Sequence, residues 1–398
     1  MPGHPPVVIV GAGIAGLTLS LCLARAGIRV TLLERAPVLT EVGAGLQLSP
    51  NATNILFHLG LGSALDATGV RPEAVVVREA MTGKTLVRMP LGDTMVSRYG
   101  APYVVIHRGD LQQVLLQAVE NEPRVRLSLG VEVVAVRQDA EGVEVDIVAG
   151  GEATTIRGGV LVGADGVRSM VREKVMGGGA AIYSGRTAWR ATIAADDWPD
   201  AGHYAEDTTL WLGAGAHLVH YNIDAGRAIN IVAVIDDKWT DEGWDVPGDR
   251  RQIEAAFAAW PIAPRALIGL ASGWRKWALC GAPDDTPWVD GRVVLIGDAV
   301  HAMLPFVAQG AAMAIEDARM LTAALMASDG TVQERLALYA ELRKPRAERV
   351  VAMARRNGTV YHLGGVMARG RDLVLRLMGP QRLLQAMDWI YGWRPEDI

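Results

Sequence analysis

The sequence predicts an α/β fold in which a parallel sheet is interrupted by an inserted antiparallel sheet and followed by a helical C-terminus. Three observations predict it. A β-branched run at 7–10 leads through a glycine-rich turn into an apolar helical pattern over 14–26 and a second strand over 29–33, which is a βαβ start. Strand-like segments separated by Gly or Asp turns fill 183–240. Helical patterns continue after residue 312.

The other elements follow in order along the chain. They are expected as a helix over 52–59, a hairpin over 75–90, a helix over 110–120, and strands over 125–129, 131–137, 143–148 and 159–164. The predicted domains are a discontinuous nucleotide-binding domain (1–70, 98–175 and 285–330), a substrate domain of mixed or antiparallel sheet (71–97 and 176–284) and C-terminal helices (331–398). The sheet-rich insert therefore separates the two halves of the α/β domain.

Composition and charge exclude several classes of protein. A net charge of −5 and a pI near 5.9 argue against a nucleic-acid binder. Cys22 and Cys280 form no disulfide framework, and Cys22 is expected to be packed inside a helix. No signal peptide and no apolar run of about 18 residues is visible, so a cytoplasmic protein without a membrane span is expected. The basic run Arg343–Arg356 is interpreted as a solvated helix face, with an anion site as the alternative.

The first motif is the glycine-rich turn Gly11-Ala-Gly13-Ile-Ala-Gly16. Gly11 permits a tight turn, Gly13 lets the backbone approach a pyrophosphate, and Gly16 lets the helix pack on the strand. Such a turn alone is a weak signal, and its alternative is a turn without a ligand. Here it follows a strand, opens a helix and is followed by Glu34, which can accept hydrogen bonds from ribose hydroxyls. The motif does not separate FAD from NAD.

Two later motifs each follow a buried strand. In Gly291–Ala318, the strand Val293–Ile296 ends at Asp298, and a proline-containing turn then leads into a helix that begins near Gly310. A turn of this kind brings backbone N–H groups and a helix N-terminus close to a bound ligand. The segment Gly163–Ser169 (GADGVRS) repeats the strand-to-carboxylate pattern. A simple nicotinamide dehydrogenase needs neither motif.

Together with HRGDL at 107–111, these motifs give the chain a resemblance to a known family. It resembles the single-component FAD-dependent aromatic hydroxylases, relatives of salicylate hydroxylase and 3-hydroxybenzoate 6-hydroxylase. The resemblance spans most of the chain and is specific for the family but not for the substrate. It implies a Rossmann-like FAD-binding domain, non-covalently bound FAD, and NAD(P)H that binds transiently, since no second fingerprint for a nicotinamide nucleotide is visible. No metal is expected.

The resemblance also assigns residues to the flavin. It makes Glu34 the ribose ligand, Asp298 the ligand of the ribityl chain and Pro305 a residue on the oxygen-reacting face. Arg108 becomes a flavin or pyrophosphate contact, with a surface arginine capping the helix at Asp110 as the alternative. The residues expected at the cofactor are Gly11, Gly13, Ala15, Gly16, Glu34, Arg35, Gln47, Arg108, Asp165, Asp298, Gly310, Ala311 and Ala312. Gln47 is expected at the flavin edge, where the hydroxynicotinate branch of the family has a His, and it is also a candidate substrate contact.

The candidate substrate residues lie in AHLVHYNI, residues 216–223. Alternate residues of a strand share a face, so His217 and Tyr221 point one way and His220 the other. The resemblance places His217 and Tyr221 in the aromatic pocket. Oxygen transfer is faster to a phenolate than to a phenol, so a His can serve as the base that takes the hydroxyl proton. Without the family context, such a His and Tyr are more often structural.

Three further side chains have open roles. Arg190, and with it Arg186, can face a substrate carboxylate, and a surface salt bridge is the alternative for both. His301 is expected to pack against the cofactor.

The resulting expectation is an FAD-dependent monooxygenase that uses NAD(P)H and O2 to hydroxylate a small phenolic acid, salicylate-like or hydroxybenzoate-like, through a C4a-hydroperoxyflavin. The alternatives are a same-fold monooxygenase acting on a hydroxypyridine, a hydroxynicotinate or a larger tailoring substrate, and a non-catalytic nucleotide-binding relative. The substrate, the accompanying decarboxylation and the choice between NADH and NADPH stay open. The chain is expected to be a monomer or homodimer without nucleic-acid or membrane partners.

Overall fold

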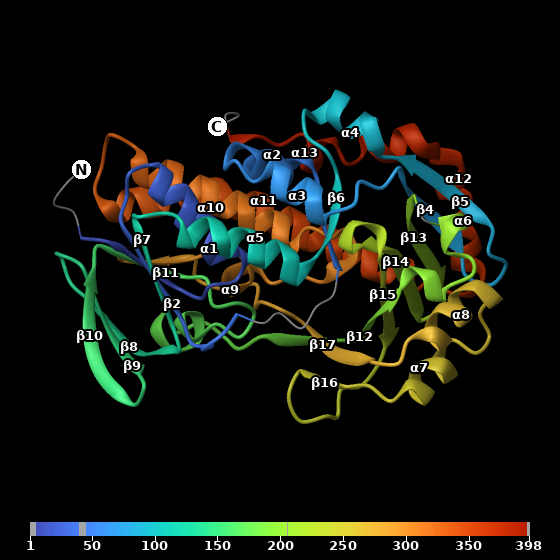
Figure 1. Cartoon of the computed structure of the whole chain (residues 1–398), viewed down its shortest axis with the longest axis horizontal. Helices are drawn as coiled ribbons and strands as arrows, with labels where there is room; N and C mark the ends of the chain where they lie inside the picture. The colour runs from blue at the N-terminus through green and yellow to red at the C-terminus, as the bar shows by residue number, and fades with distance from the viewer. Residues whose placement is uncertain (1–4, 40–44, 205, 396–398) are drawn as a thin grey trace.

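The computed structural model describes residues 5–39, 45–204 and 206–395 of the 398-residue chain. It confirms the α/β fold with an inserted antiparallel sheet and a helical C-terminus (Figure 1). Six strands form the first sheet, in the spatial order β18 (Val289–Asp290), β19 (Val293–Leu295), β11 (Val160–Gly163), β1 (Val7–Val10), β2 (Val30–Glu34) and β7 (Val125–Leu129). All neighbours are parallel except β18 and β19.

Helices cover this sheet because its strands are apolar on both faces. Ile9, Leu161 and Val294 are fully buried. The helices of this part are α1 (Ile14–Arg25), α2 (Pro50–His58), α3 (Gly62–Thr68), α5 (Arg108–Glu120), α9 (Asp298–His301) and α10 (Gly310–Met326). A separate three-stranded antiparallel sheet contacts β1 and β2 and consists of β8 (Val131–Gln138), β9 (Val143–Ala149) and β10 (Glu152–Gly158).

The inserted sheet has eight strands. Their order is β16 (Asp245–Pro247), β17 (Arg275–Gly281), β12 (Ile182–Ala194), β15 (Ala228–Asp236), β14 (Ala216–Ile223), β13 (Asp207–Gly213), β4 (Ala74–Glu79) and β5 (Thr85–Pro90). Only β13 and β4 pair in parallel, so the hairpin predicted at 75–90 joins the insert. One face packs tryptophans against α7 (Arg250–Ala256) and α8 (Ile262–Leu270). The other face packs on the turn Pro305–Val307, which forms a short 3-10 helix.

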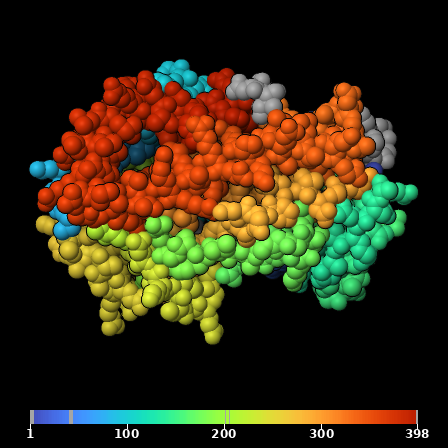
Figure 2. All heavy atoms as spheres, turned by 180° about the vertical axis from the view of Figure 1, so that it is seen from behind, coloured from blue at the N-terminus to red at the C-terminus, as the bar shows by residue number. Residues whose placement is uncertain are grey.

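The C-terminal part of the chain, described for residues 331–395, is helical, as predicted. It contains α11 (Val332–Tyr361), α12 (Gly365–Gln385) and α13 (Asp388–Tyr391). Helix α11 packs against α10, and α12 packs against β5. Figure 2 shows that this segment covers the upper part of the back of the molecule. The domain boundaries themselves stay a prediction. Within the described residues, no helix combines the length and the apolar character needed to cross a bilayer.

Several elements escaped the sequence analysis. They include β10, β16, β17, β18, α3, α7, α8, the helix α4 (Gly92–Tyr99), the short helix α6 (Ala201–Tyr204), and a two-stranded ribbon of β3 (Gly45–Leu48) and β6 (Val104–His107). The helix predicted from Asp110 begins at Arg108 instead, because the His107 side chain caps it by accepting a hydrogen bond from the Gly109 N–H.

The prediction of a solvated helix face at Arg343–Arg356 is wrong at its N-terminal end. Arg343 is fully buried between α11 and α10, where it donates to Glu316 Oε2 at 2.6 Å and to Asp317 Oδ1 at 2.8 Å. Arg346 also donates to Glu316, at 2.7 and 2.8 Å. The arginines lie inside because α10 presents two fully buried carboxylates to this face of α11, and a buried charge needs a partner.

Candidate active site

The glycine-rich turn between β1 and α1 has the shape that a phosphate site requires. Gly11 adopts φ +102°, and a Cβ there would lie 2.5 Å from the Ala164 carbonyl oxygen. A Cβ on Gly16 would lie 1.9 Å from the Gly11 oxygen. A Cβ on Gly13 would meet nothing within 4 Å. Gly11 and Gly16 are therefore required by close backbone packing, and open space lies beside Gly13, where a pyrophosphate can approach.

The three motifs found in the sequence meet at one edge of the six-stranded sheet. The strands that carry them, β1, β11 and β19, are neighbours. A Cβ on Gly297 would lie 3.2 Å from the Ala15 side chain and 3.1 Å from that of Ala314 in α10. Asp298 is exposed, although the residues that follow it in α9 are buried. The Gly310 turn faces it, since a Cβ on Gly310 would lie 3.9 Å from Asp298 Oδ1. This edge fits a dinucleotide cofactor.

Two carboxylates that are predicted to contact the cofactor, Glu34 and Asp165, also stabilise the turns in which they lie. Glu34 accepts hydrogen bonds from the backbone N–H groups of Ala12 at 2.8 Å and Ala36 at 2.9 Å. Asp165 accepts from Ser169 Oγ at 2.5 Å and from the Val171 N–H at 3.1 Å, and burial raises its pKa. Their contacts with a cofactor stay predictions. The same holds for Arg35, which is exposed after β2, for Arg108, which is half-buried at the start of α5, and for Ala311 and Ala312 in the first turn of α10.

His217 lies on the face of β14 that looks toward the Pro305 turn. Its ring is 5.2 Å from that of Phe306 and 5.5 Å from that of Tyr361. Its Nδ1 lies 2.7 Å from Nε2 of His362, the residue that follows α11. Burial, reinforced by His362 and Arg186, holds the pKa of His217 well below its usual value. The imidazole is therefore neutral near pH 7.

Tyr221 lies on the same face, beneath the ribbon strand β3. A Cβ on Gly45 would lie 2.6 Å from the Tyr221 ring, and the Gly45 N–H donates to Asn230 Oδ1 at 2.7 Å. Gln47 hydrogen-bonds to Tyr221 and accepts from the Tyr103 hydroxyl at 2.5 Å. Burial raises the Tyr221 pKa, so the phenol stays protonated. The structure thus brings together two residues, Gln47 and Tyr221, that lie far apart in the sequence.

The two candidate arginines of β12 differ in their surroundings. Arg190 pairs across the sheet with Val232, which pairs with Val219, so Arg190 shares the face of His217 and Tyr221. Its guanidinium lies 5.2 Å from the Trp277 ring. Arg186 forms an ion pair with Asp236 at 3.0 Å. Of the two roles considered for Arg186, the structure therefore shows the salt bridge.

Several residues around this face were missed by the sequence analysis. They are Tyr103, Asn230, Phe306, Tyr361 and His362. Phe306 stood beside a predicted residue, and its carbonyl accepts from the Tyr361 hydroxyl at 3.1 Å. His362 ends a long helix, and no local motif marks it.

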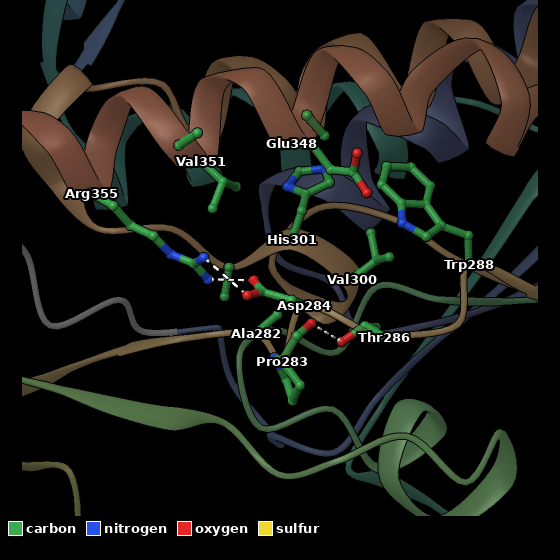
Figure 3. Close-up of a pocket in the computed structure, with 13 residues that line it drawn as sticks. Ala282, Pro283, Asp284, Thr286, Trp288, Val300, His301, Glu348, Val351 and Arg355 are labelled. Carbon is green, nitrogen blue, oxygen red and sulfur yellow. Dashed lines mark hydrogen bonds and ion pairs between the residues drawn. The ribbon is translucent and has the colours of Figure 1, made fainter.

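A separate cavity of about 240 Å³ lies between α9, α11 and the segment after β17 (Figure 3). Arg355 and Asp284 form an ion pair of 2.6 Å beside it. His301 lines this cavity, and its packing against the cofactor stays a prediction. Its ring centroid is 5.6 Å from that of Trp288, and its Nε2 is 2.6 Å from Asp317 Oδ2. Apart from His301, none of the residues that line the cavity is among those predicted at the cofactor or the substrate.

Comparisons with known proteins show the family to which the chain belongs. A family model described as FAD binding domain matches residues 4–354. The chain is 37% identical over 390 residues to 3-hydroxybenzoate 6-hydroxylase 1 of Aquipseudomonas alcaligenes, covering 98% of each chain. It is 37% identical to a 3-amino-4-hydroxybenzoate 2-monooxygenase of Streptomyces platensis, covering 99% of this chain and 98% of the relative. It is 34% identical to 6-hydroxynicotinate 3-monooxygenase of Bordetella bronchiseptica, covering 90% and 92%.

Solved structures share the fold. A salicylate hydroxylase in complex with its substrate is 26% identical, with a TM-score of 0.82 and coverage of 99% of this chain and 97% of that one. HpxO from Klebsiella pneumoniae, complexed with FAD and uric acid, is 24% identical, with a TM-score of 0.85 and coverage of 97% and 96%.

Proposed function

The chain belongs to the FAD binding domain family of flavin-dependent aromatic hydroxylases, and from this premise we propose that it hydroxylates 3-hydroxybenzoate or a close analogue, using NAD(P)H and O2. It is an oxidoreductase, a monooxygenase whose cofactor is FAD. Support for this substrate comes from relatives named 3-hydroxybenzoate 6-hydroxylase, which match nearly the whole chain. Salicylate-like and hydroxybenzoate-like acids were both expected from the sequence, and the names of these relatives favour 3-hydroxybenzoate.

The edge formed by β1, β11 and β19 would hold the cofactor. Gly13 would lie against the pyrophosphate, Glu34 would accept hydrogen bonds from the ribose, and Asp298 would do so from the ribityl chain. When bound, FAD takes up reducing equivalents from NAD(P)H and activates dioxygen for transfer of one atom to the aromatic ring. The protein positions the ring and keeps water away from it.

His217 would be the base. Its Nδ1 is engaged with His362, which leaves Nε2 as the ring nitrogen for the substrate hydroxyl. Because the imidazole is neutral, Nε2 can accept the phenol proton, and the electron-rich phenolate then reacts faster with an electrophilic oxygen. The observation that carries the proposal is that His217, Tyr221 and Arg190 share one sheet face beside the Pro305 turn.

Tyr221, Gln47 and Arg190 would orient the substrate. The Arg190 guanidinium suits a carboxylate, with which it can form paired charge-assisted hydrogen bonds. Tyr221 keeps its proton and can donate to an oxygen of the ring substituents. Pro305 would lie on the oxygen-reacting side, because it begins the turn that carries Phe306 against His217.

The test is a substrate screen with product identification. Purified FAD-loaded protein is given NADH or NADPH together with 3-hydroxybenzoate, salicylate, 3-amino-4-hydroxybenzoate or 6-hydroxynicotinate. We expect 3-hydroxybenzoate to give the largest rise in NAD(P)H oxidation and a dihydroxylated product. Turnover of only one of the other three acids would assign the site to that acid, and a protein that binds no flavin would contradict the proposal altogether.

A further inference from the structure

Three side chains connect the candidate base to the surface. His217 Nδ1 lies 2.7 Å from His362 Nε2, and His362 Nδ1 lies 2.6 Å from Asp236 Oδ1. His217 is 3% exposed, whereas the Asp236 side chain is 52% exposed. We propose that these three side chains form a proton relay, in which His362 and Asp236 carry the proton of the substrate hydroxyl from His217 to solvent. The inference rests on the proposed role of His217 as the base.

The order of donors and acceptors in the relay follows from Asp236, its last member. A carboxylate only accepts, so His362 Nδ1 carries the proton and donates it to Asp236. The Nε2 of neutral His362 is then an acceptor, and the Nδ1–H of His217 must donate to it. The remaining lone pair of His217 is therefore on Nε2, the atom that the substrate hydroxyl requires. Asp236 thus sets the tautomer of a histidine two links away.

The relay balances one proton in and one proton out. The phenol O–H bond breaks as a new N–H bond forms at His217 Nε2. The Nδ1 proton of His217 passes to Nε2 of His362, and the Nδ1 proton of His362 passes to the Asp236 carboxylate, which releases it to water. Both imidazoles end neutral with their tautomers exchanged. The reverse transfer restores the starting state, because an oxygen of the product takes the proton from His217 Nε2 and a proton from water returns through Asp236 and His362. No electron leaves or enters the chain.

Burial and the Arg186 cation oppose a lasting positive charge on either ring, and on His362 they outweigh the Asp236 carboxylate, which favours one. The groups that face His217 are His362 and Tyr361 from the end of α11 and Arg186 from β12. Those that face His362 are Asp236 from β15, Arg186 and His217. Burial lowers the pKa of both histidines, and the Arg186 cation acts in the same direction. A proton taken at His217 is therefore passed on, because a single buried histidine in this position would be a weak base.

His362 is fixed from several sides, as a relay requires. Its backbone carbonyl accepts from the Gly215 N–H at 3.0 Å, which ties the end of α11 to the β13–β14 turn. The preceding Tyr361 donates to the Phe306 carbonyl. Arg186 holds Asp236 at 3.0 Å on its Oδ1, the same oxygen that His362 contacts. These contacts therefore fix the positions of the three side chains.

The experiment measures proton release when the substrate binds. Oxidised FAD-loaded enzyme is mixed with 3-hydroxybenzoate in weak buffer containing a pH indicator, and the rate of proton release is followed by stopped flow beside the phenolate absorbance. In His362→Gln, whose amide can hydrogen-bond but does not relay protons, we expect release to slow by about 10²-fold, the lower end of general-base effects, and hydroxylation to fall with it. The dissociation constant of 3-hydroxybenzoate should stay close to that of the wild type, and His58→Gln, an exposed histidine of α2, is the control.

The outcomes separate the relay from the base. Asp236→Asn, a change on a half-exposed side chain, should also slow release and keeps the test valid if His362→Gln does not fold. A relay is contradicted if both variants release protons at the wild-type rate while His217→Ala does not, and it is equally contradicted if they lose substrate affinity but not release rate. If His217→Ala itself hydroxylates and releases protons normally, the proposed function of His217 fails instead.

Discussion

The two faces of strand β14 carry one histidine each, and the two residues differ in what they connect to. His217 and His220 are both buried, and burial lowers the pKa of both, that of His220 to about 3. His220 lies in an aromatic box with ring centroids of Trp198 and Tyr204 at 5.3 and 5.2 Å. Its Nε2 has no hydrogen-bond partner among the described residues. His217 is linked to His362 and Asp236. Burial and a lowered pKa therefore do not distinguish the two histidines, whereas the hydrogen-bonded route to solvent does.

The largest effect should come from His217→Ala. We expect the hydroxylation rate to fall by about 10²–10⁴-fold, because the phenol then keeps its proton. Flavin reduction without substrate should barely change, since that step needs no phenolate. More of the NAD(P)H consumed should appear as hydrogen peroxide. Rapid-reaction kinetics and product yield per NAD(P)H measure these quantities, and a loss confined to flavin reduction would assign His217 another role.

His220→Ala should have the opposite effect, lowering the stability of the protein but not its hydroxylation rate. Removing the ring leaves a cavity among Trp198, Tyr204 and Trp211, so the free energy of unfolding should fall by about 2–5 kcal/mol. The folded fraction should hydroxylate almost as the wild type does. Denaturant unfolding and the hydroxylation rate per bound FAD measure the two quantities. Equal catalytic losses for His217→Ala and His220→Ala would show that the two faces are not functionally distinct.

Asp298→Ala tests whether an activity lost through weaker FAD binding can be distinguished from an activity lost with the base His217. The exposed Asp298 carboxylate stands where a ribityl hydroxyl would donate to it, and a hydrogen bond to a charged group contributes about 1.5–3 kcal/mol. FAD should therefore dissociate about 10–150-fold more readily. Titration of apoprotein with FAD gives the constant, and Asp285→Ala, in an exposed loop, is the control. Once saturated with FAD, Asp298→Ala should recover its hydroxylation, whereas His217→Ala should not.

The smallest effect concerns pH and stability. An unfolded histidine titrates near pH 6.5, while the pKa of buried His220 is about 3. Between these values the unfolded chain binds the extra proton, so stability falls as the pH falls, by about 1.4 kcal/mol per pH unit for each such group. His220→Phe removes one group and should reduce that slope by about this amount between pH 6 and 4. Denaturant unfolding at fixed FAD concentration measures it, and an unchanged slope would mean that His220 is protonated in the folded protein.

Local sequence patterns predicted most of the elements of the six-stranded sheet and its helices. Strands β1, β11 and β19 are short apolar runs, each followed by a turn with Gly or Asp, so each could be found without knowing its neighbours. The solvated interpretation of Arg343 failed because helix composition does not reveal that α10 presents Glu316 and Asp317 to it. Helices α7 and α8 were missed because they are short and lie between strands.

The substrate side could be predicted only in part. Alternation along one strand was enough to separate His217 and Tyr221 from His220. The contacts of these residues could not be predicted from the sequence. Their partners come from β3, β12 and the end of α11, which only the folded chain brings together. The link between His217 and His362 joins residues far apart in the sequence and has no signature in either segment.

The position of β19 has a consequence for synthesis of the protein on the ribosome. Strand β11 lies between β1 and β19, and β19 begins only at Val293. Until that segment emerges, the nascent sheet ends at β11, whose residues Val160–Gly163 would present an apolar, unpaired edge, the kind of surface that promotes aggregation. The turn with Asp298 is missing at the same stage. A growing chain can therefore neither close this edge nor add the turn with Asp298 until the segment from Val293 has emerged, and it is most vulnerable to aggregation during that interval.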